Sequence, residues 1–152
     1  MLTTRTRNVS EVLNKAMVFS MEPVLKRYAK VYELPMSVVR EHERELKRYL
    51  TMCIIREPGV GSYGVRGEVD ELWHMFLIFT KPYSDFCETV AGRFIHHSPT
   101  ETSKGNSHEK YARTLRAYES IFGEPAPAHI WPALRESDDT SSSSSSEDID
   151  NS

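Results

Sequence analysis

The chain has 152 residues, of which 39% are hydrophobic and 27% are charged, and its formal net charge is −3. This length and composition are typical of one soluble globular domain with a buried core. All 19 lysines and arginines but only 16 of the 22 acids lie in residues 1–135, which therefore carry about +3. That excess is too small to indicate nucleic acid as the main partner, and no apolar run approaches the roughly 18 residues of a membrane-spanning helix.

Three amphipathic helices are predicted before the glycine-rich loop at residues 56–67. Ser10 can cap the first helix, Pro35 ends the second, and Ser37 can cap the third, which runs through SVVREHERELKRYLTMCII. The loop REPGVGSYGVRG has four glycines, but no lysine follows them, as the GxxxxGK[ST] pattern of a phosphate-binding loop requires. We therefore expect a connecting loop there and no nucleotide site.

The densest apolar periodicity lies in residues 68–99, which we expect to form a tryptophan-bearing helix, a second helix ending at Gly92, and a short segment with two histidines. Cys53 and Cys87 lie at apolar helical positions, and no secretory signal is visible. Both features favour reduced thiols in a cytoplasmic or nuclear protein that is not secreted. The core residues predicted from this stretch, together with one from the C-terminal segment, are Trp73, Phe76, Tyr83, Phe86, Cys87 and Trp131.

Four polar residues of the same stretch form a candidate site. Asp70 and His74 are four positions apart, so they share one side of a helix, and Asp70 can fix the tautomer of the His74 ring. His96 and His97 follow in the next segment. A carboxylate and imidazoles are ligands of Zn²⁺ and Fe²⁺, so the four residues could hold a divalent metal. The alternative is that Asp70 and His74 lock the helix to the histidine pair by hydrogen bonds without an ion.

The rest of the chain predicts one further helix after Ser107 and then a proline-rich segment, EPAPAHIWPAL, that docks as a clasp through Ile130 and Trp131. No convincing period-2 strand is visible. The predicted fold is therefore all-α, a compact bundle of about six helices with an irregular C-terminal clasp. We expect a flexible N-terminus over residues 1–9 and a single helical domain over residues 10–135.

Residues 136–152 differ in character, with six acids, no base and a run of serines. Such a segment has almost nothing to bury, so we predict a disordered acidic tail. Ser144 and Ser145 each have an acid three positions later, which resembles the pattern phosphorylated by casein-kinase-2-type enzymes. Phosphorylation would make the tail more acidic and would favour a eukaryotic or eukaryotic-virus protein. The alternative is a tail that only aids solubility.

Several motifs in order, VDELWHMFLIFTKPYSDFC, GRFIHHSP and FGEPAPAHIWP, resemble a domain of unknown function usually called glycine-rich domain-containing-protein-like. The resemblance covers roughly residues 45–133. This chain departs from the pattern at Phe76, where the family often has a second histidine, at Ala91, and at Ala126 and Ala128 in the proline run. The resemblance implies a helical domain and brings no established reaction.

Two functions from different classes remain open. The first is an interaction or regulatory module with a protein partner, whose acidic tail tunes binding. The second is a Zn²⁺- or Fe²⁺-binding protein, or an enzyme, that uses Asp70, His74 and His96 or His97, with Cys87 as a less favoured alternative. The sequence shows no spacing typical of a nucleophile and its base, no HExxH and no CxxC motif. It therefore leaves the reaction, the partner and the oligomeric state open.

Overall fold

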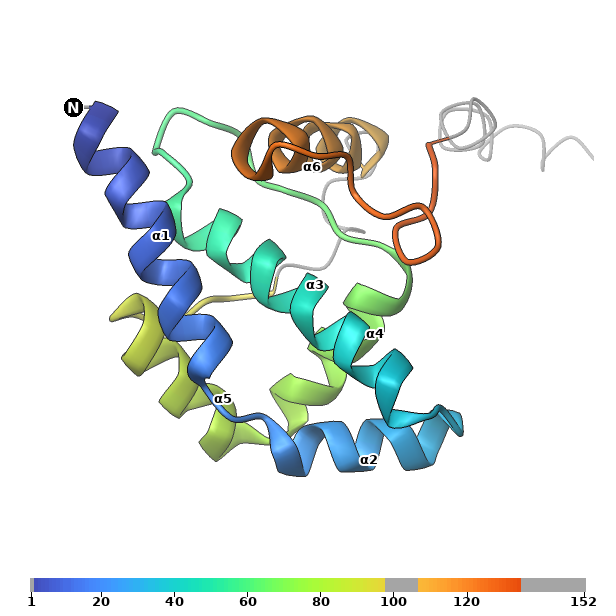
Figure 1. Cartoon of the computed structure of the whole chain (residues 1–152). Coiled ribbons are helices and arrows are strands. Elements are labelled where there is room, and N and C mark those ends of the chain that lie inside the picture. The colour runs from blue at the N-terminus through green and yellow to red at the C-terminus, as the bar shows by residue number, and fades with distance from the viewer. Residues whose placement is uncertain (1, 98–106, 135–152) are drawn as a thin grey trace, which may run out of the picture.

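The computed structural model describes residues 2–97 and 107–134, with side chains from residue 8 onward. This part of the chain is all-α and holds no strand, which confirms the predicted fold class (Figure 1). The elements in chain order are α1 (Leu2–Val18), α2 (Glu22–Tyr32), α3 (Met36–Ile55), α4 (Gly67–Ile78), α5 (Thr80–Phe86), the π-helical turn η1 (Cys87–Ala91) and α6 (Ser107–Phe122).

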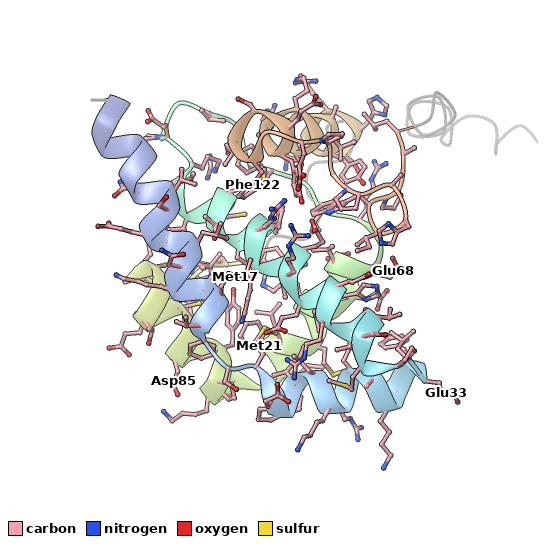
Figure 2. All side chains as sticks on the ribbon, in the orientation of Figure 1. Met17, Met21, Glu33, Glu68, Asp85 and Phe122 are labelled. Atoms are coloured by element: carbon pink, nitrogen blue, oxygen red, sulfur yellow. The ribbon has the colours of Figure 1, made fainter. Side chains whose placement is uncertain are left out.

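Helix α3 is the central element of the bundle. It contacts α1, α2, α4 and α6, and Figure 1 shows it crossing the middle of the molecule between them. Leu46 and Leu50, one turn apart on α3, have no exposed surface. Figure 2 shows Met21 among the side chains between the helices, whereas Glu33 and Asp85 lie at the periphery. One buried apolar face per helix therefore builds the core, as the 3.6-residue periodicity predicts.

Two helix starts differ from the sequence prediction. Helix α1 begins at Leu2 instead of Ser10, so Ser10 lies inside the helix. Residues 2–9 contain no glycine or proline that would stop the helix from extending toward the N-terminus. Helix α3 begins at Met36, with Pro35 as its N-cap in the extended conformation, so Ser37 is not its cap. Pro35 suits that position because its ring fixes φ near −65°.

The aromatic core joins the helices to the C-terminal clasp. Trp73, Phe76, Tyr83, Phe86, Cys87 and Trp131 are all buried. In the clasp, the Trp131 Nε1–H donates to Glu45 Oε1 at 3.0 Å, and the Tyr118 hydroxyl donates to the same oxygen at 2.6 Å. The buried Glu45 carboxylate thus ties α3 to both α6 and the clasp.

None of the described helices is both long enough and apolar enough to cross a membrane. The predicted tail at residues 136–152, with its candidate phosphorylation sites Ser144 and Ser145, lies outside the described residues.

Candidate metal centre

Helix α4 places Asp70 and His74 one turn apart on one side of the helix, near its N-terminal end. Gly67 opens the helix with a φ of +75°, a conformation that favours glycine. A Cβ on Gly67 would also lie 2.8 Å from Cδ of Pro132. The start of α4 therefore packs tightly against the clasp, and this contact fixes where Asp70 lies.

The segment that carries the histidine pair leaves the helices through the π-helical turn η1. Gly92 ends the turn with a φ of +74°, and its N–H lies 2.9 Å from the carbonyl oxygen of Cys87 and 3.2 Å from that of Glu88. The N–H of Ile95 then donates to Cys87 Sγ at 3.4 Å. These contacts hold residues 93–97 against α5 and η1.

The Tyr83 hydroxyl connects this segment to α4. It donates to the carbonyl oxygen of Ile95 at 2.5 Å and accepts a hydrogen bond from Trp73 Nε1–H at 3.1 Å. Tyr83 and Trp73 are both buried, and burial raises the pKa of the Tyr83 hydroxyl above its usual value. The hydroxyl therefore stays protonated and fixes the distance between α4 and the histidine segment.

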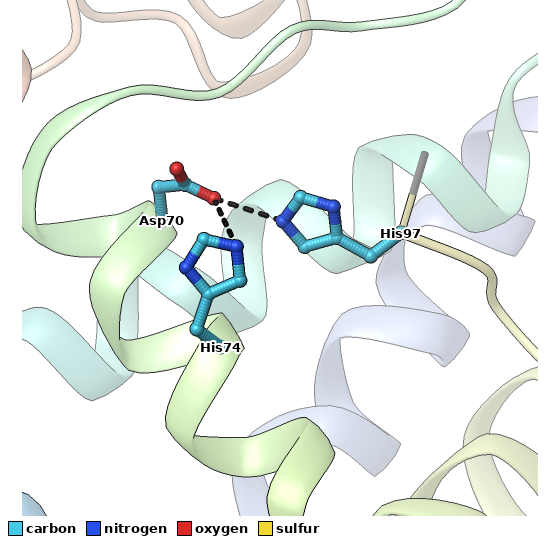
Figure 3. Close-up of side chains that lie close together, drawn as sticks. All are labelled: Asp70, His74 and His97. Carbon is cyan, nitrogen blue, oxygen red and sulfur yellow. Dashed lines mark hydrogen bonds and ion pairs between the residues drawn. The ribbon is translucent and has the colours of Figure 1, made fainter. Parts of the chain in front are cut away.

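One oxygen of Asp70 faces two imidazoles (Figure 3). Oδ1 of Asp70 lies 2.9 Å from Nε2 of His97 and 3.7 Å from Nε2 of His74. The two imidazole rings stack with centroids 4.7 Å apart and planes 15° apart, and the His97 ring also contacts Trp73. One potential ligand atom from each of the three residues lies within 4.8 Å of the other two. The structure therefore brings together Asp70, His74 and His97.

The three residues differ in exposure. The side chain of His97 is 13% exposed and that of Asp70 is 27% exposed, whereas His74 is 54% exposed. His97 is therefore held by its neighbours, and His74 has room to rotate. His96 does not join them: it is exposed, and its ring packs edge-on against Phe94. Adjacent residues of an extended segment point in opposite directions, which explains why one histidine of the pair turns inward.

The cluster lies on the wall of a cleft of about 860 Å³. Four basic side chains from different parts of the chain line this cleft, namely Arg56, Arg66, Arg93 and Lys110. Asp70 is the one carboxylate among the described lining residues. The cleft is therefore a basic region in a chain whose formal net charge is negative. Sequence reasoning missed it because its arginines lie on loops, where periodicity gives no signal.

Neither cysteine belongs to the cluster. Cys87 is buried and accepts the Ile95 N–H. Cys53 lines the cleft, but burial raises the pKa of its thiol to about 11, against the smaller lowering influence of Tyr49 and of Arg56 and Arg93. A thiol with such a pKa is neutral near pH 7, so Cys53 does not present the thiolate that a nucleophile or soft-metal ligand requires.

Fold and site together define a helical domain that carries an aspartate–histidine–histidine cluster beside a basic cleft. Residues 11–121 match the model of the UCP032817-like family, and the chain belongs to this family. The matched span includes all three residues of the cluster and ends before the clasp. Neither curated proteins nor solved structures include one that matches the chain. The family description states no reaction, and it does not specifically support the glycine-rich domain-containing-protein-like resemblance, which stays a prediction.

Proposed function

We propose that this protein binds one divalent transition-metal cation, Zn²⁺ or Fe²⁺, through Asp70, His74 and His97. The observation that carries the proposal is the Asp70 oxygen that faces both imidazole nitrogens at the edge of a large cleft. Two imidazoles and one carboxylate form a common ligand set for both metals. Three protein ligands leave a coordination position open for water or another molecule, and the cleft gives that molecule access.

The distances support this assignment after a small rearrangement. Bonds of about 2.1 Å to a tetrahedral cation require ligand atoms roughly 3.4 Å apart. Asp70 and His97 are already near that separation, at 2.9 Å, and His74 Nε2 lies 3.7 Å from the same oxygen. Because more than half of the His74 side chain is exposed, its ring can turn toward the other two ligands at little cost.

A purely structural role makes a different prediction for His74. The hydrogen bond between Asp70 and His97 is enough to hold the histidine segment on α4, whereas 3.7 Å from His74 to Asp70 is too long for a hydrogen bond. If the cluster is only structural, removing the His74 ring should cost no more than its stacking on the His97 ring and should not change the uptake of Zn²⁺. If the cluster holds a cation, the same change removes a ligand and leaves the tether between α4 and His97 intact.

The test uses protein purified without a histidine tag. We expect calorimetric titration with Zn²⁺ to give one site per chain in the wild type, with binding at least about tenfold weaker in His74→Ala, Asp70→Asn and His97→Ala. His96→Ala is the matched control, because it removes a neighbouring imidazole outside the cluster, and it should bind as the wild type does. His74→Ala should also unfold close to the wild-type temperature, because it loses only the stacking of a half-exposed ring on His97.

Two results would refute the proposal: wild-type protein that takes up less than a tenth of a cation per chain, or His74→Ala binding as tightly as His96→Ala. Supplying Fe²⁺ without oxygen in a parallel titration decides which metal binds better. The interaction module and its protein partner remain a prediction from the sequence, as does the cytoplasmic or nuclear location.

A further inference from the structure

The cleft beside the cluster has a marked charge imbalance. Its described lining includes four basic side chains and one carboxylate, and that carboxylate is the Asp70 of the proposed metal site. A divalent cation with one carboxylate and two neutral imidazoles keeps a net charge of +1. Filling the metal site would therefore add to the positive charge of the cleft, which indicates a negatively charged ligand.

Two of the bases lie together around the end of α3. Arg56 directly follows the last residue of α3, and its guanidinium donates to the carbonyl oxygen of Val60. Arg93 comes from the histidine segment, and its guanidinium donates to the carbonyl oxygen of Ile54 on the last turn of α3, at 3.2 Å. Both guanidinium groups are close enough to Cys53 to influence the pKa of its thiol. The two cations therefore flank the same corner of the cleft.

Neither arginine has an ion pair with a carboxylate among the described residues, and both are exposed. Each guanidinium carries five N–H donors in a planar fork that matches carboxylate and phosphate oxygens. Within the part of the chain that the structure describes, each of these side chains donates one such hydrogen bond, which leaves most of its N–H donors available to a ligand.

The size and the rim of the cleft suit a small molecule. A volume of about 860 Å³ lies within the usual range of roughly 300–1,000 Å³ for small-molecule sites. Phe94 lines the cleft and keeps 48% of its surface exposed, so its ring offers an apolar face beside the charged groups. A small ligand that combines an oxyanion with an apolar or aromatic part would match both features.

We infer that the cleft binds a small molecule carrying a phosphate or carboxylate group, which Arg56 and Arg93 hold while one of its oxygens occupies the open position of the metal. This second contact rests on the proposed function, whereas the contacts of the arginines do not. Phosphate and carboxylate are both oxyanions, and titration with one compound of each kind distinguishes them.

Three probes with one aromatic ring each separate these contributions: phenyl phosphate, benzoate and uncharged benzyl alcohol. We expect Zn²⁺-loaded wild-type protein to bind phenyl phosphate, benzoate or both in calorimetric titrations, and not benzyl alcohol. The double substitution Arg56→Gln/Arg93→Gln should weaken binding of the anion at least about tenfold, as expected for two lost charge-assisted contacts. Arg27→Gln is the matched control, because Arg27 is exposed on α2, which contributes no residue to the cleft.

A measurement on the wild type keeps the test independent of how the variant folds. Phenyl phosphate or benzoate should shift the NMR signals of the His97 and Phe94 rings, and benzyl alcohol should not. The inference is overturned if the Zn²⁺-loaded protein binds neither anion, if neither anion shifts these signals, or if the double variant binds as tightly as Arg27→Gln.

Titrations without metal separate the two proposals. Binding of an anion that needs both arginines, in protein that takes up no Zn²⁺, would refute the proposed metal site and leave the anion site standing. Zn²⁺ uptake without binding of any anion would refute the anion site alone.

Discussion

The Tyr83 hydroxyl is predicted to stabilise the contact between α4 and the histidine segment of the candidate site. Tyr83→Phe removes one oxygen and leaves the aromatic ring in place. That oxygen accepts the Trp73 Nε1–H and donates to the carbonyl oxygen of Ile95, and all three residues are buried. The substitution therefore leaves one donor on α4 and one acceptor on the histidine segment without their partner, in a region with little water.

Each buried polar group that loses its partner costs about 1–3 kcal/mol. With two such groups, we expect Tyr83→Phe to lower the free energy of unfolding by about 2–6 kcal/mol. For a chain of this size, that corresponds to a decrease of roughly 6–18 °C in Tm. The same change should loosen residues 93–97, so Zn²⁺ should also bind more weakly if His97 is a ligand.

Urea denaturation followed by tryptophan fluorescence and by far-ultraviolet circular dichroism measures the effect. Tyr32→Phe is the matched control, because the Tyr32 hydroxyl donates to Glu71 Oε1 at 2.8 Å on the exposed surface. That variant should unfold almost as the wild type does. Equal stability of the Tyr83→Phe and Tyr32→Phe variants would show that the Tyr83 hydroxyl does not bridge buried partners, and the account of how His97 is positioned would fail.

Three further predictions follow from burial and backbone geometry. Burial raises the pKa of Tyr111 to about 12, so as the pH rises the unfolded chain loses the hydroxyl proton before the folded chain does. The free energy of unfolding, measured by denaturation, should therefore decrease as the pH rises above about 10. Burial lowers the pKa of His42 below 6.5, so as the pH falls the unfolded chain takes up a proton on this residue before the folded chain does. The free energy of unfolding should therefore decrease below about pH 6.5 in the wild type, and less so in His42→Gln. Gly67→Ala should lower the free energy of unfolding by about 2–4 kcal/mol, because its φ is positive and the added Cβ would clash with Pro132. Gly92→Ala should lower it by only about 1–2 kcal/mol, because the added Cβ meets open space. Equal Tm values for these two variants would contradict the packing of α4 on the clasp.

The amino-acid sequence predicts the helices well, because each one buries an apolar face with a clear 3.6-residue period. Its errors lie at helix ends, where local signals compete. Ser10 is a good N-cap residue, yet α1 continues past it to Leu2 because nothing there breaks the helix. Ser37 loses the cap position to Pro35, whose fixed φ already suits it.

The candidate site could be predicted only in part. The spacing of Asp70 and His74 is a property of one helix, so the sequence contains it. The choice between His96 and His97 depends on how the chain leaves η1 and on the hydrogen bonds of Ile95, which are tertiary contacts. The approach of Arg93 to the end of α3, which Arg56 directly follows, likewise depends on the packing of a loop against that helix, and no local pattern encodes it.

The π-helical turn at Cys87–Ala91 has a consequence for how this architecture can vary. A π-helical turn holds one residue more than an α-helical turn of the same height, so it changes the direction in which the chain departs after Gly92. Deleting one residue within the turn would restore ordinary α-helical winding, so the chain after Gly92 would leave in another direction. The His97 ring and the Arg93 guanidinium would then both move out of their present positions. The positions of these two side chains therefore depend on the number of residues in η1, a turn that contains neither of them. Homologous proteins could change both positions by inserting or deleting one residue in this turn.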